Sequence, residues 1–334
     1  MPTILIIGAG LSGLTAAREL TRQGHTVTLL DKGRGIGGRL ATRRLGNGRA
    51  DHGAQYFSAQ SPEFHALTQE MSQAGVVHEW HLEQSDPAGF RHPRWVGSEG
   101  MNSIAKYLAQ GLDVQTECTV TRIAPAKTGW TLTTTEQDNT RIFSADVLLI
   151  TVPAPQALAL CDASGLALAE ADKAALEAIH YAPCLAVMLQ LNGPSQLPEP
   201  GGLKQTDGDD QHSPVAWLAD NAQKGISPNQ TTVTLHASHA FSQAHLDDPD
   251  QQALIPLLTA DVTHYIPADS IVDRQIHRWR YSNAIKRHPT PFLSAQAHAP
   301  LLFGGDGFGN GNVEGAFLSG LAMGKRVQGL KSKV

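Results

Sequence analysis

The feature that most constrains the fold of this chain is a glycine-rich turn near its start, between an apolar run and an amphipathic stretch. Residues 3–7 read Thr-Ile-Leu-Ile-Ile, residues 8–13 read Gly-Ala-Gly-Leu-Ser-Gly, and residues 27–31 read Val-Thr-Leu-Leu-Asp. This order predicts a strand, a turn, a helix and a second strand that ends in an acid, which is the βαβ unit of dinucleotide-binding proteins. A glycine turn without a ligand is disfavoured as the alternative, because every part of the motif is present.

Each residue type in this unit has a mechanical role in phosphate binding. Gly8 forms the tight turn, Gly10 allows the backbone to approach a pyrophosphate, and Gly13 allows the helix to pack closely against the sheet. The N-terminus of that helix attracts the charge of the phosphates. Asp31 can accept a hydrogen bond from a ribose hydroxyl and would repel a ribose phosphate, so NADP is not the expected nucleotide.

A second glycine-rich segment follows the acid directly and favours FAD over NAD. Residues 32–39 read Lys-Gly-Arg-Gly-Ile-Gly-Gly-Arg. FAD needs more backbone donors beside its phosphates than the first turn supplies, and Arg39 can pair with a phosphate oxygen. Arg43 and Arg44, in contrast, are expected in a solvated basic loop.

A third segment near the C-terminus is predicted to bind the remainder of the cofactor. Residues 301–306 read Leu-Leu-Phe-Gly-Gly-Asp, and a helix of small residues is expected from Val313. Asp306 can bind the ribityl or phosphate region, although an ordinary turn aspartate is the alternative. The positive end of the helix can stabilise the anionic reduced flavin. The residues predicted to bind FAD are Gly8, Gly10, Leu11, Ser12, Gly13, Asp31, Lys32, Gly38, Arg39, Gln55, Tyr56, Val120, Asp306 and Val313.

Further motifs resemble a known family of flavoproteins. Residues 51–57 read Asp-His-Gly-Ala-Gln-Tyr-Phe, residues 151–156 read Thr-Val-Pro-Ala-Pro-Gln, and residues 277–281 read His-Arg-Trp-Arg-Tyr. Together with Trp-Val-Gly at 95–97 and Val-Glu-Gly-Ala at 313–316, these motifs are similar to those of bacterial renalases, which are related to the flavin amine oxidases. The resemblance extends from the first expected strand to the last expected helix.

The resemblance implies a definite reaction. Renalase-like proteins oxidise the 1,2-dihydro and 1,6-dihydro isomers of NAD(P), pass a hydride to the flavin and return NAD(P)+, and dioxygen then yields hydrogen peroxide. Under this interpretation Gln55 and His236 hydrogen-bond the carboxamide of the substrate or flank its ring. The glycine- and asparagine-rich run at 307–312 departs from the expected pattern. The preferred isomer and the loop shape beside the flavin therefore stay open.

The substrate is expected to lie between flat side chains that orient a planar ring for hydride transfer. The predicted pocket residues are Gln55, Tyr56, Trp95, His236, Trp279 and Tyr281. Ordinary core packing of the aromatic residues, and a structural role for each histidine, are the alternatives. No metal is expected, because the histidine pairs at 78/81 and 236/239 would point to opposite faces of a strand.

Two other functions remain open. The first is a flavin amine oxidase, which usually places a lysine near the flavin. No lysine stands in one of the motifs above, and Lys286 lies in an evident polar loop. The second is a non-catalytic binding protein on the same fold, against which the intact glycine unit, Arg39 and Asp306 speak.

Composition narrows the class of protein further. The chain has 334 residues, of which 17% are charged, and its formal net charge is −5, so nucleic acid is not an expected partner. The three cysteines, Cys118, Cys161 and Cys184, are scattered and lie outside the flavin motifs, which favours a reduced cytoplasm and non-covalent FAD. We expect no signal peptide and no membrane span. The expected oligomeric state is a monomer or a weak dimer.

The expected fold class is α/β, with two interleaved domains. The first is a Rossmann-like FAD-binding domain of the glutathione reductase type, similar to that of p-hydroxybenzoate hydroxylase, at residues 1–70, 98–155 and 296–334. The second is a mixed-sheet α+β substrate domain at residues 71–97 and 156–295. A strand is predicted over 114–123, and a surface loop over 193–213, which is rich in Pro, Gly and Asp.

Overall fold

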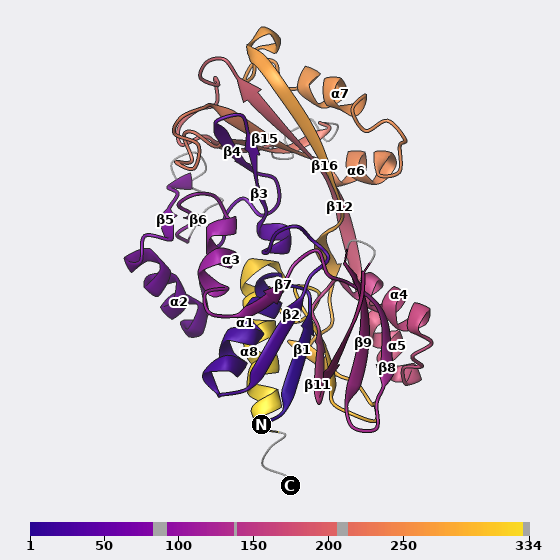
Figure 1. Ribbon diagram of the computed structural model, residues 1–334. Helices are drawn as coiled ribbons and strands as arrows, with labels where there is room; N and C mark the ends of the chain where they lie inside the picture. Colours follow the sequence, from indigo (N-terminus) through magenta and orange to yellow (C-terminus); the bar gives the residue numbers. More distant parts are fainter. Residues whose placement is uncertain (83–91, 137–138, 206–212, 330–334) are drawn as a thin grey trace. The chain divides into compact units, whose positions relative to one another are not determined.

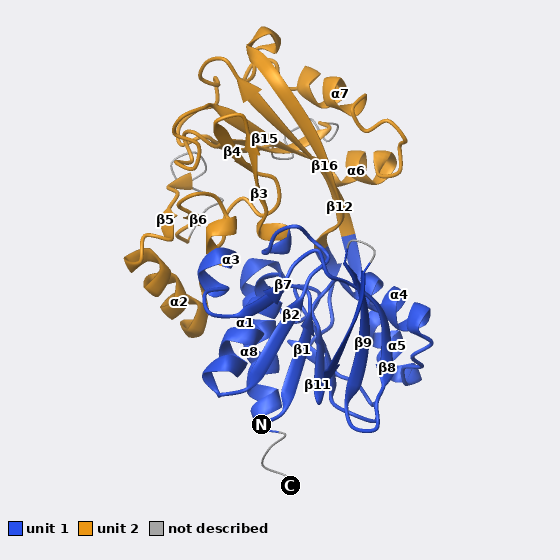
Figure 2. Ribbon diagram, viewed as in Figure 1, with its two compact units in different colours: residues 1–38, 105–181, 284–334 blue, residues 39–104, 182–283 orange. Residues whose placement is uncertain are grey.

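The computed structural model describes residues 1–82, 92–136, 139–205 and 213–329, and these residues form two compact units (Figures 1 and 2). Unit 1 comprises residues 1–38, 105–181 and 284–334, and unit 2 comprises residues 39–104 and 182–283. Each unit is therefore assembled from segments that are distant in the sequence.

A six-stranded sheet in the order β17-β18-β11-β1-β2-β7 forms the centre of unit 1 (Figure 1). The pairs β18-β11, β11-β1, β1-β2 and β2-β7 are parallel, and β17 runs antiparallel to β18. The four residues of β11 are all buried, as expected for a strand that is covered on both faces. The strand bounds are β1 (Thr3–Ile7), β2 (Thr26–Leu30), β7 (Asp113–Gln115), β11 (Val147–Ile150), β17 (Phe292–Ser294) and β18 (Leu301–Gly304).

Two helices of unit 1 pack closely against each other at glycines. These are α1 (Leu11–Arg22) and α8 (Asn312–Gln328). A Cβ atom added at Gly320 of α8 would lie 2.2 Å from the carbonyl oxygen of Ser12 in α1. Only glycine allows this approach, which brings the start of α1 against α8.

A three-stranded antiparallel sheet completes unit 1, together with the helices α4 (Ala154–Ser164) and α5 (Glu170–Glu177). Its strands are β8 (Thr119–Pro125), β9 (Trp130–Glu136) and β10 (Asn139–Ala145). The predicted single strand over 114–123 is wrong, because the chain leaves β7 and enters β8 through a turn. Glu117 has a φ of 55° there, and its N–H donates to the carbonyl of Gly33. This turn moves the chain from one sheet to the other.

The main sheet of unit 2 has five strands in the order β13-β14-β15-β12-β16. The helices α6 (His239–His245) and α7 (Leu254–Ala260) belong to the same unit (Figure 2). Part of the segment predicted as a surface loop over 193–213 forms β13, which pairs with β14, and residues 206–212 lie outside the described residues. The strand bounds are β12 (His180–Leu191), β13 (Gly202–Lys204), β14 (Val215–Asp220), β15 (Thr232–Ala237) and β16 (Ile271–Lys286).

Unit 2 also contains shorter elements from the N-terminal third of the chain. The hairpin of β3 (Thr42–Leu45) and β4 (Gly48–Asp51), and the pair β5 (Val77–Glu79) and β6 (Trp95–Gly97), are both antiparallel. Helix α2 (Pro62–Gln73) is capped by Ser61, whose side chain accepts from the N–H of Phe64, as its sequence predicts. Helix α3 (Asn102–Leu108) follows β6 and belongs to unit 2 only up to Ile104, because residues from Ala105 onward belong to unit 1.

The compact units differ from the predicted domains at four segments. Residues 39–70 and 98–104 lie in unit 2, and residues 156–181 and 284–295 lie in unit 1. Side-chain contacts give the physical reason. Thr232 of β15 donates its hydroxyl hydrogen to the carbonyl of Arg49, which fixes the hairpin to the five-stranded sheet. In unit 1, Ser164 at the end of α4 accepts from the N–H of Ile123 in β8.

Helices that could cross a bilayer are absent from the described ranges, because none of them combines the necessary length and apolar character.

Candidate active site

The turn after β1 has the geometry of a phosphate-binding loop. Gly8 has a φ of 104°, which favours glycine, and a Cβ at Gly13 would lie 2.0 Å from the carbonyl oxygen of Gly8. Gly10 differs from both, because a Cβ added there meets no protein atom within 4 Å. The space in front of Gly10 is therefore open, whereas Gly8 and Gly13 are required by the protein's own packing.

The beginning of α1 offers hydrogen-bond donors to an anion in this space. No side chain caps the helix, so the first N–H groups lack the usual side-chain acceptor. The hydroxyl of Ser12 in the first turn is buried and has no hydrogen-bond partner in the described part of the chain. An open turn, uncapped N–H groups and an orphaned hydroxyl fit a bound pyrophosphate.

Asp31 joins the first two glycine segments. Its carboxylate accepts from the N–H of Ala9 at 2.6 Å and from the N–H of Gly33 at 2.7 Å. The N–H of Gly37 donates to the carbonyl of Ala9, and Gly38 has a φ of 54°. Each carboxylate oxygen has a second lone pair, so Asp31 can also accept from ribose hydroxyls. Its structural role in holding the turn was not foreseen from the sequence.

The third segment forms a buried loop between β18 and α8. Asp306 follows β18 and is buried, and the N–H of the preceding Gly305 donates to the hydroxyl of Ser319 in α8. Gly311, with a φ of 73°, precedes α8 and provides no side-chain cap. The first turn of α8, which contains Val313, thus resembles that of α1 in leaving its N–H groups uncapped. Both helices offer a positive N-terminus.

Three further residues that were predicted to bind the cofactor lie in different surroundings. Lys32 is exposed, and Val120 of β8 is half-buried against the apolar core of unit 1. The Nη1 atom of Arg39 lies 3.1 Å from the carbonyl oxygen of Tyr281 and 3.2 Å from that of Ser282. Arg39 is therefore fixed to the backbone of β16. Contrary to the expectation of a solvated basic loop, Arg43 lies in the strand β3.

The rings of His52, His277 and Trp279 form a cluster in unit 2. The ring centroids of His52 and His277 are 4.7 Å apart, and that of Trp279 lies 4.4 Å from His277 and 5.3 Å from His52. The Nε1–H of Trp279 donates to the carbonyl oxygen of His52 at 2.7 Å. Trp279 was predicted as a pocket residue, whereas His52 was not singled out although it lies in the motif at 51–57.

Both histidines of this cluster are neutral at physiological pH. Burial, followed by His277 and Arg43, lowers the pKa of His52 to about 3. Burial, followed by the charge of Arg43, lowers the pKa of His277 to about 4. The cluster therefore presents uncharged rings.

Gln55 and His236, two of the predicted pocket residues, are adjacent. Gln55 Nε2 lies 2.7 Å from the carbonyl oxygen of Asp51 and 3.3 Å from His236 Nε2. Burial lowers the pKa of His236 to about 4, a hydrogen bond to the backbone of His52 raises it, and the charge of Lys224 lowers it. The Oε1 atom of Gln55 is buried without a partner among the described residues.

Tyr56 belongs to a second aromatic group. Its ring centroid is 5.7 Å from that of Trp217 and 6.4 Å from that of Trp80. Trp217 pairs in register with His236 across β14 and β15, so the two side chains share a face of the sheet. Trp95 is separate, because it pairs with Phe57 through the backbone and makes no ring contact with the other predicted pocket residues in the described ranges.

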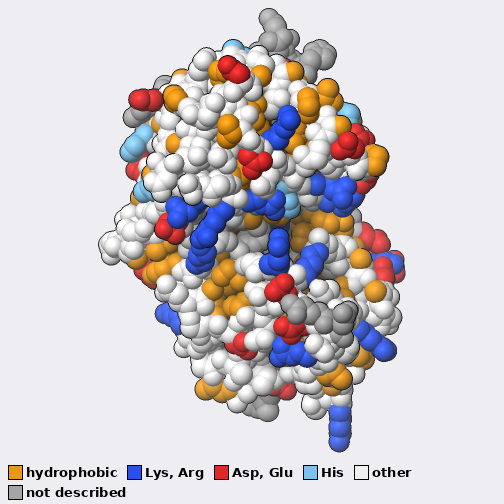
Figure 3. Space-filling view, turned by 45° about the horizontal axis from the view of Figure 1, so that its top comes forward, with side chains coloured by type: hydrophobic (Ala, Val, Ile, Leu, Met, Phe, Trp, Pro, Cys, Tyr) orange, Lys and Arg blue, Asp and Glu red, His pale blue; other side chains and the backbone are white. Residues whose placement is uncertain are grey.

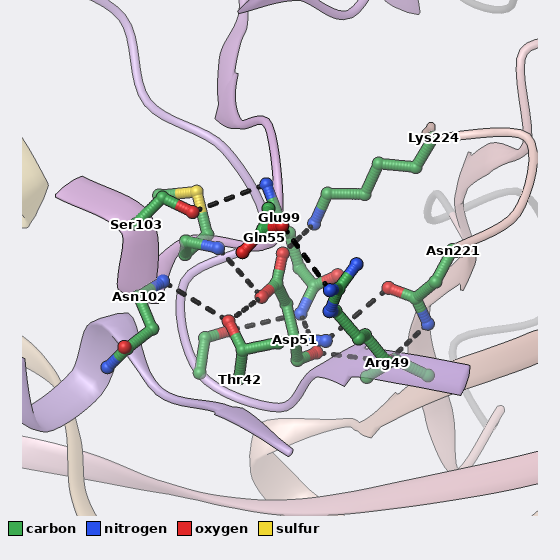
Figure 4. A network of polar contacts seen from close by, with 12 residues as sticks. Thr42, Arg49, Asp51, Gln55, Glu99, Asn102, Ser103, Asn221 and Lys224 are labelled. Carbon is green, nitrogen blue, oxygen red and sulfur yellow. Dashed lines mark hydrogen bonds and ion pairs between the residues drawn. The ribbon is translucent and has the colours of Figure 1, made fainter. Parts of the chain in front are cut away.

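Lys224 and Asp51 form a buried ion pair that the sequence analysis did not predict (Figure 4). Lys224 Nζ lies 2.7 Å from Asp51 Oδ2, and neither side chain is exposed. Asp51 Oδ1 accepts from the hydroxyl of Thr42 at 2.5 Å and from the N–H of Met101 at 2.9 Å. Burial lowers the pKa of Lys224, and Asp51 opposes this shift. The ammonium also lies 5.2 Å from the ring centroid of Trp80.

Charge is mixed on the surface. Figure 3 shows acidic and basic side chains interspersed over the surface in view. Within the described ranges, no three His, Cys, Asp or Glu side chains converge in a way that could hold a metal ion.

Two family models match the chain. Residues 6–71 match the NAD(P)-binding Rossmann-like domain, and residues 78–327 match the flavin containing amine oxidoreductase family. Together the two matches include the glycine turn, Asp31, the ring cluster and the start of α8.

Individual relatives match only short stretches. A protein described as a flavin-containing monoamine oxidase, AofH from Mycobacterium tuberculosis, is 40% identical over 68 residues, which cover 20% of this chain and 15% of that protein. The L-amino-acid oxidase of Gloydius halys is 39% identical over 67 residues, which cover 20% of this chain and 13% of that protein. The chain therefore matches only a small part of the length of either relative.

A solved structure is similar over the whole chain. It is a protein described as a protoporphyrinogen oxidase from Exiguobacterium sp. 255-15, with a TM-score of 0.71, 13% sequence identity and 98% coverage of both chains. At this identity the likeness establishes the fold.

Proposed function

Because the chain belongs to the flavin containing amine oxidoreductase family, which uses FAD, we propose that it oxidises the 1,2- and 1,6-dihydro isomers of NAD(P). The products are NAD(P)+ and, with dioxygen as the final electron acceptor, hydrogen peroxide. The chemistry that FAD supplies when bound is acceptance of the hydride. The similarity of the motifs at 51–57, 95–97, 151–156, 277–281 and 313–316 to those of bacterial renalases supports this substrate class.

The observation that carries the proposal is the uncharged ring cluster of His52, His277 and Trp279. The hydrogen bond from Trp279 to the carbonyl of His52 fixes the indole in place. The lowered pKa values keep the two imidazoles neutral. Such a cluster can stack on and orient a planar, uncharged dihydronicotinamide ring.

The chemistry of this substrate matches the weak basicity of the two imidazoles, whose pKa values are lowered to about 3 and about 4. A dihydronicotinamide becomes an aromatic pyridinium by losing one hydride, and no proton has to leave a carbon or a nitrogen atom. Rate enhancement then depends on orientation, which fixed rings supply, rather than on general base catalysis. Gln55 and His236 remain proposed partners of the carboxamide, with the buried Oε1 of Gln55 as an acceptor for an amide N–H.

The cofactor is proposed to be held without a covalent bond. The open turn at Gly10 and the uncapped start of α1 fit its pyrophosphate, and Asp31 fits a ribose. Asp306 and the first turn of α8 fit the region nearer the flavin ring. All three cysteines are buried, and none follows β18, where a thioether bond to the flavin would be expected.

A second candidate function is amine oxidation, and one observation favours it. Lys224, which no motif indicated, is fully buried and contacts Trp80, and its charge acts on His236. Its ammonium is nevertheless bound to Asp51, so it is engaged in an ion pair. The uncharged ring cluster also contains no carboxylate that could bind a protonated amine.

Oxygen consumption tests the proposed reaction directly. The FAD-loaded protein is mixed with 1,2-dihydro-NAD or 1,6-dihydro-NAD, and dioxygen, hydrogen peroxide and NAD+ are measured together. The proposal expects one molecule of peroxide and one of NAD+ for each dioxygen consumed. Ordinary 1,4-dihydro-NAD is the control substrate, because it differs only in the position of the hydride. Oxidation of primary amines with no reaction of the isomers would establish the second candidate.

A further inference from the structure

One face of the strand β16 carries a row of half-buried side chains that includes two members of the ring cluster, His277 and Trp279. Gln275, His277, Trp279 and Tyr281 alternate along the strand and therefore point to the same face. The intervening Arg278 and Arg280 are exposed, and both form ion pairs with Asp247. The row extends over about 20 Å, at roughly 3.3 Å per residue.

Arg43 lies at the Gln275 end of this row. It is half-buried in β3, and its Nη1 atom lies 3.3 Å from Gln275 Oε1. Its charge reaches both His52 and His277, since it contributes to lowering the pKa of each. In the ranges that the structure describes, no carboxylate forms an ion pair with Arg43. Arg43 is thus a cation near the uncharged rings, and its hydrogen-bond partner is the neutral amide of Gln275.

A dinucleotide substrate has the complementary chemistry. Its dihydronicotinamide ring is planar and uncharged, whereas its pyrophosphate carries two negative charges that need a cationic partner. His277 and Gln275 are two positions apart on β16, or about 7 Å, so Arg43, which is hydrogen-bonded to Gln275, lies within reach of the phosphates of a dinucleotide whose ring stacks near His277. A guanidinium can donate two parallel hydrogen bonds to phosphate oxygens. In Arg43, the hydrogen bond to Gln275 uses one nitrogen atom, Nη1.

We propose that Arg43 binds the pyrophosphate of the dinucleotide substrate and so selects dihydro-NAD(P) over phosphate-free dihydronicotinamides. The inference rests on the proposed function for the identity of the ring, and it adds the residue that recognises the rest of the molecule. Arg44 supplies a matched control. It is the next residue of β3, is exposed and points to the other face of the strand.

The experiment combines two variants with two substrates. Arg43→Gln and Arg44→Gln proteins, both loaded with FAD, are assayed with 1,6-dihydro-NAD and with the corresponding dihydronicotinamide riboside, which lacks phosphate. We expect Arg43→Gln to lower kcat/KM for the dinucleotide about tenfold or more, the usual effect of losing a charged hydrogen bond. We expect kcat/KM for the riboside to fall much less in the same variant, because the riboside lacks the phosphates that Arg43 would bind. We expect Arg44→Gln to change kcat/KM for either substrate by no more than about twofold.

Equilibrium binding separates this inference from the proposed reaction. Binding of NAD+ and of nicotinamide riboside to each FAD-loaded protein is measured by calorimetry at two salt concentrations. Weaker binding of NAD+ alone in Arg43→Gln, with a reduced salt dependence, supports the role of Arg43 even if no dihydro isomer is oxidised. The inference would be overturned if Arg43→Gln weakened the binding of NAD+ and of the riboside equally, or if the two variants had equal effects. It would also be overturned if NAD+ binding did not depend on Arg43.

Discussion

The ammonium of Lys224 lies 2.7 Å from the carboxylate of Asp51, and neither side chain reaches solvent. The two residues come from β4 and from the turn between β14 and β15, which are distant in the sequence. The backbone carbonyl of Asp51 also accepts from Gln55 and from the hydroxyl of Thr234. The ion pair therefore fixes the strand that carries the motif at 51–57 to the five-stranded sheet.

Removing one member of this pair should destabilise the protein strongly. Lys224→Met leaves the carboxylate of Asp51 buried without its cation, which typically costs about 3–5 kcal/mol. The double variant Asp51→Asn with Lys224→Met leaves no buried charge and should recover most of this loss. Urea unfolding at constant excess FAD measures both effects.

An exposed pair supplies the control for this prediction. Lys173 and Glu177 are 3.9 Å apart on the surface of α5, so Lys173→Met should cost less than about 1 kcal/mol. A loss for Lys224→Met that is as small as the loss for Lys173→Met would show that the buried pair does not hold the unit together.

Stability should fall as the pH decreases from about 6.5 to about 4. The pKa of His52 is lowered to about 3, and the pKa values of His236 and His277 are lowered to about 4. Below pH 6.5 the unfolded chain binds protons that the folded chain does not, so the free energy of unfolding decreases with falling pH. Each histidine contributes a slope of about 1.4 kcal/mol per pH unit.

A single substitution tests the contribution of one of these histidines. His277→Gln removes one titrating group and also one of the interactions that lower the pKa of His52, which burial still keeps low. Urea unfolding of this variant between pH 7 and pH 4.5 should show a slope that is lower by up to about 1.4 kcal/mol per pH unit. An unchanged slope would mean that His277 titrates alike in the folded and unfolded chains.

Two glycine substitutions should have opposite effects on folding and on cofactor binding. Gly10 has a φ of −76°, which any residue can adopt, and a side chain there meets no protein atom. Gly10→Val should therefore fold normally but lose FAD, because the side chain fills the open space in front of the turn. Gly13→Ala should lower the melting temperature, since its Cβ would lie 2.0 Å from a carbonyl oxygen. The FAD-to-protein ratio and thermal unfolding give both results, and stoichiometric FAD in Gly10→Val would refute the placement of the pyrophosphate.

Trp279 should affect substrate binding and not FAD content. Trp279→Ala removes one ring of the cluster and its hydrogen bond to His52. We expect KM for the dihydro isomers to rise by up to about tenfold, since an aromatic contact contributes about 0.5–1.5 kcal/mol. Trp279→Phe keeps a flat ring and should recover part of the loss. Steady-state kinetics with unchanged KM in both variants would remove Trp279 from the pocket.

Local sequence patterns predicted the local geometry of the three glycine segments. Glycine positions and strand periodicity indicate short-range geometry directly in the sequence. Such geometry determines the turn at Gly8, the second glycine segment and the helix that begins near Val313. The resemblance assigned Gln55 and His236 to the same substrate without predicting the contact of 3.3 Å between their side chains. The local patterns did not reveal that Asp31 holds the turn through two backbone N–H groups.

The missed residues depend on pairings between distant strands. Lys224 lies in a polar turn, where a lysine is ordinarily solvated, and only the return of β4 beside β15 buries it against Asp51. Arg43 read as part of a basic loop because it adjoins Arg44, but the pairing of β3 with β4 makes it a strand residue with a defined face. The compact units differ from the predicted domains for the same reason, since a contact such as the one from the Arg39 side chain to the carbonyl of Tyr281 leaves no pattern in the sequence.

Anaerobic mixing of the FAD-loaded protein with its candidate substrates tests the proposed function most directly. Flavin absorbance is followed after addition of 1,2-dihydro-NAD, 1,6-dihydro-NAD, 1,4-dihydro-NAD or a panel of primary amines and polyamines. We expect rapid bleaching of the flavin with one or both of the first two, together with release of NAD+, and no comparable bleaching with the amines. Rapid bleaching by an amine, with an unchanged flavin spectrum in the presence of both isomers, would contradict the proposal.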